Sequence, residues 1–229
     1  FETTRRELPP REGVTTPADL LDFEPSLERI GDLVIVDEDA ADRASEIADA
    51  VLDADLPARA VLNRASKIKG ECRVRDWNVL AVDDAAMAEA GNAATAAGDA
   101  AAESADATNG DLSPTETVHR EYGHEFLLDL DAVYFSPRLA TERHRVVEQA
   151  ASGERAFDMF AGVGPFAVPL AKRGATCVGT DINEEAVEYL GRNAERNDVA
   201  DSVTAIHGDV REVADDYVGW ADRIVMNLP

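Results

Sequence analysis

The spacing of hydrophobic and polar positions changes near Pro137 and divides the chain into two regions. Before Pro137, short apolar runs bounded by turn residues predict strands, and one segment with apolar residues at helical spacing predicts a helix. This pattern is typical of a small α+β unit. The predicted strands cover residues 31–39, 58–63, 73–82, 116–123 and 124–130, and the predicted helix covers residues 41–54.

After Pro137, predicted strands and helices alternate along the chain. Strand–helix repeats at this spacing predict a parallel sheet with right-handed crossovers. The expected fold class is therefore α/β, a Rossmann-like domain preceded by the small α+β domain. The chain begins with Phe1 and stops after its fourth parallel strand, so we expect a fragment of a longer protein. The predicted helices cover residues 137–151, 165–174 and 183–198, and the predicted strands cover 155–160, 175–182, 203–209 and 222–227.

Two segments lack a pattern that would bury a core. Residues 1–27 are polar, contain four prolines and show little periodicity, so we expect a linker or the remnant of an N-terminal domain. Residues 83–111 contain 13 alanines and no aromatic residue, which predicts a disordered or loosely helical acidic insertion. We therefore expect a small α+β domain at 28–130, and the first part of a second domain at 131–229.

The charge balance is strongly acidic, because 46 Asp and Glu against 22 Lys and Arg give a formal net charge of −24. Such a balance argues against nucleic acid as a partner. Two circumstances would reverse that conclusion: molar salt inside the cell, where the Debye length falls to about 3 Å, or a local gathering of cations. Residues 59–75 carry six cations against Glu71 alone, which indicates such a patch. The alternative is an ordinary solvated surface.

Composition also excludes some function classes. No run of about 18 apolar residues occurs, so we expect no membrane helix. Cys72 and Cys177 are the only cysteines, and no cysteines or histidines show metal-ligand spacing. We therefore expect no metal site, and we interpret both cysteines as small buried apolar residues.

The segment DMFAGVGPF joins the first parallel strand to its helix. Asp158 ends the strand, and Gly162 and Gly164 allow a tight turn and the close approach of a ligand. Asp181 ends the next strand, where an acid faces the hydroxyl groups of a bound ribose. Asp209 follows the third strand, where it is expected to reach an adenine edge. Each acid alone could instead cap a helix or a turn.

The start of the helix after these glycines argues against a dinucleotide. Pro165 follows Gly164 and removes a backbone N–H donor from the place where a pyrophosphate would need one. A ligand with an adenosine part and no phosphate fits better, and S-adenosylmethionine (SAM) has that structure. Phe160 is expected to line the same pocket.

Several segments, this loop included, carry a resemblance to a known family: DMFAGVGPFAVPLAK, TDINEEAVEYL, GDVREV, DRIVMNLP, VYFSPRLATER, KGECRVR and ETVHREYG. Together they resemble the archaeal and eukaryotic Trm5-type tRNA (guanine-37 N1)-methyltransferases. The resemblance covers about residues 29–82 and 112–229. It implies a class I methyltransferase domain preceded by a small RNA-binding domain. It also implies truncation at both ends, since the family continues beyond NLP and has a further N-terminal domain.

The resemblance implies a function and its partners. The expected reaction moves the methyl group of SAM to N1 of guanine 37 in tRNA, next to the anticodon. The expected enzyme is cytoplasmic, monomeric and haloarchaeal-like, and uses neither metal nor membrane. One alternative is the related aminocarboxypropyl transferase of wybutosine synthesis, although NLP at the fourth strand favours methyl transfer. Another alternative is a fragment that binds RNA or SAM without turnover.

The resemblance also implies roles for individual residues. Methylation at N1 needs a base for the N1 proton and a cation for the charge on O6. Glu142 is the expected base, with an ion pair to Arg138 four residues earlier as the alternative. Arg75 is the expected contact to O6, and Arg73 is its alternative because strand alternation puts both on one face. Asn227 is expected to hold the guanine edge, or otherwise to end a strand in an ordinary turn.

Further residues complete the two expected sites. Arg138 is expected to position the base Glu142 or to bind phosphate, and Arg143 is expected to contact the cofactor. Ile182 and Val210, each directly after an acid at a strand end, are expected beside the bound cofactor. Asn227 is expected to belong to both sites.

Overall fold

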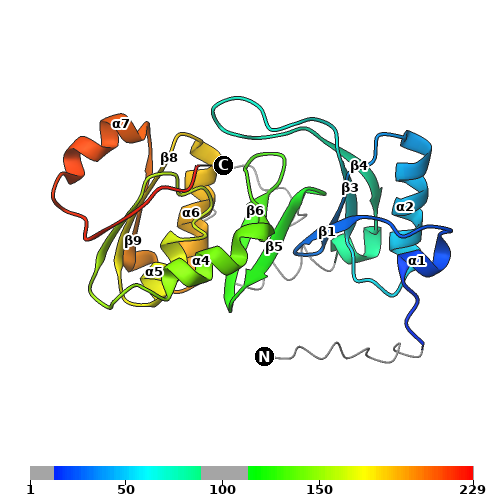
Figure 1. Ribbon diagram of the computed structural model, residues 1–229, viewed down its shortest axis with the longest axis horizontal. Coiled ribbons are helices and arrows are strands. Elements are labelled where there is room, and N and C mark those ends of the chain that lie inside the picture. The colour runs from blue at the N-terminus through cyan, green and yellow to red at the C-terminus, as the bar shows by residue number, and fades with distance from the viewer. Residues whose placement is uncertain (1–12, 89–112, 229) are drawn as a thin grey trace, which may run out of the picture.

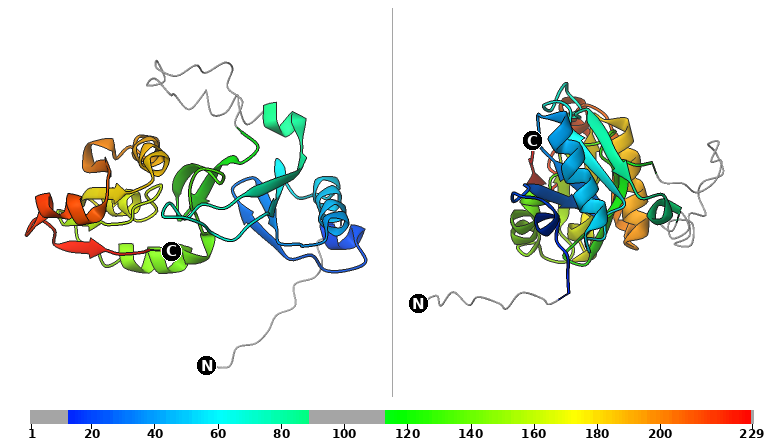
Figure 2. Two further views of the ribbon diagram at one scale, coloured as in Figure 1. Left: turned by 90° about the horizontal axis from the view of Figure 1, so that it is seen from above. Right: turned by 90° about the vertical axis from the view of Figure 1, so that its right-hand side faces the viewer.

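The computed structural model describes residues 13–88 and 113–228, so most of the insertion expected at 83–111 lies outside the described residues. Two sheets stand at opposite ends of the molecule, with a β-hairpin between them (Figures 1 and 2). Within the described ranges, no helix is long and apolar enough to cross a membrane.

The first sheet has four strands in the order β1-β2-β3-β4. The pairs β1–β2 and β3–β4 are antiparallel, and β2–β3 is parallel. The strand expected at 31–39 is thus the second half of a hairpin that turns at Gly31. The strands are β1 (Leu27–Ile30), β2 (Leu33–Val36), β3 (Ala60–Arg64) and β4 (Trp77–Val82).

Helix α2 (Ala41–Asp53) connects β2 to β3, and its Ile47, Ala48 and Val51 share one apolar cluster with these strands. The short helix α1 (Pro17–Leu20) lies beside α2. Leu21 and Phe23, which follow α1, pack against the same cluster. Residues 13–27 thus add to the first domain, where the sequence pattern predicts a linker. The sequence pattern misses this contribution because these few apolar side chains pack against the cluster without any periodicity of their own.

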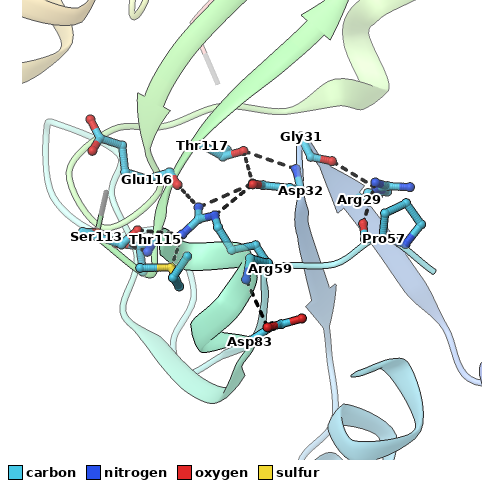
Figure 3. A network of polar contacts seen from close by, with 12 residues as sticks. Arg29, Gly31, Asp32, Pro57, Arg59, Asp83, Ser113, Thr115, Glu116 and Thr117 are labelled. Atoms are coloured by element: carbon cyan, nitrogen blue, oxygen red, sulfur yellow. Dashed lines mark hydrogen bonds and ion pairs between the residues drawn. The ribbon is translucent and has the colours of Figure 1, made fainter. Parts of the chain in front are cut away.

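The hairpin between the sheets consists of β5 (Glu116–Glu121) and β6 (His124–Asp129). Arg59, which is 1% exposed, ties it to the first sheet (Figure 3). Its guanidinium donates hydrogen bonds to Asp32 Oδ2 at 2.8 Å, to the carbonyl of Ser113 at 3.1 Å and to the carbonyl of Glu116. Arg59 therefore belongs to the structure of the molecule and not to an exposed cationic patch.

Gly31 permits the close approach of this hairpin to the first sheet. Its φ is +59°, and a Cβ atom there would lie 2.1 Å from Thr117 Oγ1. Thr117 in turn donates to Asp32 Oδ1 at 2.7 Å. A side chain at position 31 would separate the two elements.

The second sheet has four parallel strands in the order β10-β7-β8-β9, which confirms the expected α/β class with a parallel sheet. The strand order reverses at β7, because β8 and β9 lie on one side of it and β10 lies on the other. Ligands bind at the carboxyl ends of parallel strands near such a reversal. The strands are β7 (Arg155–Asp158), β8 (Thr176–Asp181), β9 (Val203–His207) and β10 (Arg223–Val225).

Helices cover the second sheet, and the helix that follows each of β7, β8 and β9 begins near the carboxyl ends of the strands. Leu170 of α5 and Leu190 of α6 are fully buried in the main apolar core of the molecule. The helices are α4 (Ala140–Val147), α5 (Ala167–Lys172), α6 (Glu184–Arg196) and α7 (Val210–Val213). Short 3-10 turns lie at Pro137–Leu139, Ala200–Ser202 and Ala214–Tyr217.

Asn193 of α6 and Asn197, the residue directly after this helix, attach the hairpin to the second domain. The Asn193 amide accepts a hydrogen bond from the N–H of Leu127 at 2.7 Å and donates to its carbonyl at 2.9 Å. The Asn197 amide pairs in the same way with Glu125, at 3.0 and 2.7 Å. The two side chains thus satisfy backbone groups of β6 as a neighbouring strand would.

Candidate active site

A cavity of about 520 Å³ lies at the carboxyl ends of β7, β8 and β9 and beside the segment after β10. The loop between β3 and β4 reaches across from the first domain (Figure 1), and its turn at residues 70–73 forms part of the wall. Most of the expected cofactor residues line the cavity, and Asp158 and Gly164 do not. Those that line it are Arg143, Phe160, Gly162, Asp181, Ile182, Asp209, Val210 and Asn227.

The loop after β7 is fixed by its glycines. Gly162 has φ +51°, and its N–H donates to Asp181 Oδ2 at 2.8 Å. Gly164 has φ +91°, and a Cβ atom there would lie 2.5 Å from Leu190 Cδ1. Only glycine adopts these backbone angles without strain. Gly164 therefore lets the loop pack closely against Leu190 of α6.

Asn193 holds the same loop from behind. Its Nδ2 donates to the carbonyl of Val163 at 2.9 Å, in addition to its two bonds with Leu127. Asn193 is 0% exposed, so these backbone groups have no water to replace the amide. The pattern of the sequence does not reveal this role, because an asparagine on a helix gives no sign of its partners.

Asp181 presents a fixed carboxylate to the cavity. Besides Gly162, the backbone N–H of Asn183 donates to it, at 3.0 Å. Asn183 also caps α6 and donates to the carbonyl of Ala132 at 2.8 Å. Each carboxylate oxygen has a second lone pair, so Asp181 can still accept hydrogen bonds from two hydroxyl groups.

Asp209 caps α7 and forms an ion pair with Arg211. Hydrogen bonds from the Arg211 side chain and backbone lower the pKa of Asp209 to about 2. The carboxylate at this corner is therefore ionised at neutral pH. It can accept a hydrogen bond and cannot donate one.

Asp158 lies behind the loop and is 1% exposed. Its Oδ1 accepts a weak hydrogen bond from the N–H of Phe160 at 3.4 Å, and its Oδ2 has no partner within the described chain. Burial raises the pKa of Asp158 to about 7. Asp158 is thus placed to support the loop, whereas its position at the end of the strand predicts a contact with the cofactor.

The family comparisons agree with this architecture. Residues 117–229 match the TRM5/TYW2 methyltransferase domain, and residues 13–84 match the TYW2 N-terminal domain. The chain belongs to the TRM5/TYW2 family.

Individual relatives extend the match over the whole chain. The tRNA (guanine(37)-N(1))-methyltransferase Trm5b of Pyrococcus abyssi is 38% identical over 100% of this chain and 60% of its own length. The chain thus spans little more than half of such TRM5/TYW2 relatives. A complex of aTrm5 with tRNALeu has a TM-score of 0.70 and 31% identity, over 89% of this chain and 52% of that one. Methanocaldococcus jannaschii Trm5 with adenosine has a TM-score of 0.65 and 29% identity, over 89% and 51%.

Arg143 is buried and lines the cavity. The TRM5/TYW2 resemblance implies that it contacts the cofactor. It is 3% exposed, and its Nε donates to Glu121 Oε1 at 2.8 Å. Its Nη2 donates to the carbonyl of Ser136 at 3.1 Å, and its guanidinium lies 5.2 Å from the centre of the Phe135 ring. Glu121 ends β5, and the strand pattern gives no sign that it pairs with an arginine far along the chain.

Glu142 does not line the cavity. Its side chain is 54% exposed and pairs with Arg145, and a hydrogen bond from that guanidinium lowers the pKa of Glu142. The alternative reading of Glu142, an ion pair with Arg138, is wrong, because Arg138 Nε donates to Glu28 Oε1 at 3.0 Å instead. Leu139, one turn earlier on the same face, does line the cavity, so Glu142 lies one helical turn from its rim.

A second pocket of about 260 Å³ adjoins the first and shares part of its wall. Its cations are Arg64, Arg73, Arg75 and Arg138, against the single acid Glu28. Arg73 and Tyr134 are among the residues that line both pockets. The cationic patch expected in this region is therefore only partly available, since Arg64 pairs with Glu28 and Asp37.

The strand argument for Arg73 and Arg75 is wrong. β4 begins only at Trp77, and Arg73 has φ +59° in the turn that precedes it. The guanidinium of Arg75 lies 5.4 Å from the centre of the Trp77 ring. Of the two pockets, Arg75 lines only the second, whereas Arg73 lines both.

Cys72 of the same turn is exposed, contrary to expectation, and Cys177 is buried as expected. Among the described residues, no cluster could hold a metal ion.

Proposed function

We propose that the protein to which this chain belongs transfers the methyl group of SAM to N1 of guanine 37 in tRNA. The observation that carries the proposal is the pair of adjoining pockets. One has carboxylates at the strand ends, and the other is lined by four arginines. A methyl donor and a guanine could meet at the wall that Arg73 and Tyr134 share.

The main cavity fits SAM by its chemistry. Asp181 would accept from the ribose hydroxyls, and Asp209 from the amino group of adenine. Phe160 and Ile182 give apolar walls for the rings. Pro165 presents no N–H at the glycine loop, which suits a ligand without phosphate. When bound, SAM supplies an electrophilic methyl group.

The second pocket fits a guanine. Deprotonation of N1 spreads negative charge onto O6, and an arginine in this pocket would stabilise that charge. Arg75 remains our candidate, and Arg73 its alternative. Asn227 lines the main cavity directly after β10, where its amide could hold the guanine edge.

Glu142 is proposed as the base for the N1 proton. It would have to exchange its ion pair with Arg145 for the bound guanine. The exposed position of this pair permits such an exchange, because water screens an exposed ion pair and can replace either partner. Loss of the Arg145 contact would also raise the pKa of Glu142 towards its ordinary value, which strengthens the base.

The competing proposal is transfer of the aminocarboxypropyl group, since the matched family includes TYW2. SAM labelled separately in its methyl and aminocarboxypropyl groups distinguishes the two reactions. The proposal expects methyl label alone in tRNA. Aminocarboxypropyl label in tRNA would replace it with the TYW2 reaction. Calorimetry on the 229-residue chain alone tests whether this part of the protein binds SAM or tRNA. If it binds neither, these residues are inert by themselves, and the proposal for the intact protein still stands.

The acidic charge supports a further proposal, that the protein works as a monomer in the cytoplasm of a cell with high salt. Salt would screen the repulsion of the net charge of −24. The expected result is higher thermal stability in 2 M KCl than in 0.1 M KCl. Equal stability at both concentrations would contradict the halophilic part, and light scattering tests the monomer.

A further inference from the structure

The tip of the β5–β6 hairpin carries an unusual residue. Glu121 pairs with His124, so Tyr122 and Gly123 alone form the turn. Their φ angles are +48° and +84°, which is the type I′ arrangement that favours Asn-Gly. A tyrosine in the left-handed region is strained, because its Cβ lies close to the following carbonyl oxygen. Strain of this kind is often retained where the side chain has a function.

The Tyr122 ring is held as a platform. It stacks on His144 of α4, with the ring centres 4.0 Å apart and the planes inclined by 6°. Tyr122 is 53% exposed, although it is large and aromatic. One face of the ring is thus covered by the imidazole, and more than half of the surface of Tyr122 is left exposed to a ligand.

The surroundings of this platform are suited to a nucleic-acid backbone. A cavity of about 280 Å³ beside Tyr122 and His144 is lined by the cations Arg143, Lys172 and Arg173 and by the acids Glu121 and Glu148. Arg143 is buried and paired with Glu121, so Lys172 and Arg173 are the cations that a ligand can reach. Arg173 pairs with Glu148 at 2.7 Å, and Lys172 lies 3.5 Å from the exposed Asp198. Both pairs are partly exposed, so their cations can also reach a phosphate.

This cavity lies next to the candidate active site. Arg143 and Pro165 line both cavities, so the two are separated by a single wall. A polymeric ligand that inserts one nucleotide beside the main cavity therefore has other nucleotides close to the platform.

We propose that the Tyr122–His144 pair is a stacking platform for an unpaired base of the bound tRNA, with Lys172 and Arg173 close to the adjacent phosphates. This inference rests on the proposed function, because it takes tRNA as the substrate. Proteins bind single-stranded nucleic acid by combining aromatic platforms with cations. In a chain of net charge −24, stacking gives affinity that phosphate contacts alone cannot supply.

The test compares Tyr122→Asn and Tyr122→Trp in the intact protein, with tRNA affinity measured by fluorescence anisotropy at fixed salt. Loss of one base stack costs about 1–3 kcal/mol, so Tyr122→Asn should weaken tRNA binding by about 5–150-fold. Asn-Gly suits the turn, so this variant should also melt at a higher temperature than the unaltered protein. Tyr122→Trp should retain the tRNA affinity within about threefold, since tryptophan also stacks.

Two further readouts separate stacking from other causes. SAM affinity should be unchanged in both variants, and the dependence of tRNA affinity on salt should keep its slope, because stacking releases no counterions. Normal tRNA binding by Tyr122→Asn, or equal losses in both variants, would overturn the inference alone. No tRNA binding by the unaltered protein would overturn the proposed function and this inference together.

Discussion

Replacement of Asn193 by alanine tests how the glycine loop is held. The variant removes an amide that is 0% exposed and bonds the N–H and carbonyl of Leu127 and the carbonyl of Val163. Each of these buried backbone groups would lose its partner. A buried unsatisfied group costs about 1–3 kcal/mol, so the variant should lose at least about 3 kcal/mol of unfolding free energy.

Asn197→Ala is the matched control. Asn197 bonds Glu125 of the same strand with the same geometry but does not touch the glycine loop. Its partner lies nearer the end of the hairpin, where water can replace the amide, so we expect a smaller loss of about 1–2 kcal/mol. Urea denaturation measures the unfolding free energies, and calorimetry measures SAM affinity under native conditions.

The two variants should differ most in SAM affinity. Asn193→Ala releases the Val163 carbonyl between Gly162 and Gly164, so it should weaken SAM binding, whereas Asn197→Ala should not. Equal SAM affinities in the two variants would refute the reasoning that Asn193 positions the loop. Equal losses of stability would refute the argument from burial.

Three further predictions concern the same site. Gly164→Ala should lose roughly 2–3 kcal/mol of unfolding free energy and bind SAM poorly, because the added Cβ would meet Leu190. Gly191→Ala is its control, since this glycine lies on an open face of α6, and it should gain about 0.5–1 kcal/mol of unfolding free energy. Burial raises the pKa of Asp158 to about 7, so the native state holds this proton more tightly than the unfolded chain. The unfolding free energy should therefore fall as pH rises from about 4 to 7, and Asp158→Asn should gain up to about 4 kcal/mol relative to the unaltered protein over that interval. Urea denaturation at each pH measures both proteins, and a difference in unfolding free energy that stays constant with pH would contradict the prediction. Glu142→Gln should slow single-turnover methyl transfer by about 10²–10⁴-fold with unchanged SAM affinity, whereas Arg145→Ala, which frees the carboxylate, should retain activity; unchanged chemistry in Glu142→Gln would remove it as the base.

The parts of the site on the parallel sheet follow from the sequence for a physical reason. Alternating strands and helices require a parallel sheet, and the carboxyl ends of its strands meet at one edge. Asp181, Asp209 and the glycine loop are therefore brought together by topology alone. The same reasoning does not reveal that Asp158 lies behind the loop, since the direction of a side chain at a strand end depends on packing.

The parts that join the two domains could not be predicted, because they depend on contacts between residues far apart in the chain. Arg138 pairs with Glu28, 110 positions earlier, and not with Glu142 one turn later. The alternation that suggests a strand through Arg73 and Arg75 continues into β4, but the chain turns at Arg73 before that strand begins. Asn193 gives no local signal, since its partners lie on another strand and in a loop.

The most direct test of the proposed reaction is mapping of the modified nucleotide. The intact protein would be incubated with SAM and an unmodified tRNA that carries guanine 37, and the digested RNA would be analysed by mass spectrometry. A parallel tRNA with adenine at position 37 gives the background. The account predicts a single methyl group on N1 of guanine 37 and none on the adenine-37 tRNA. Methylation at another position, or a mass increase of an aminocarboxypropyl group, would contradict it.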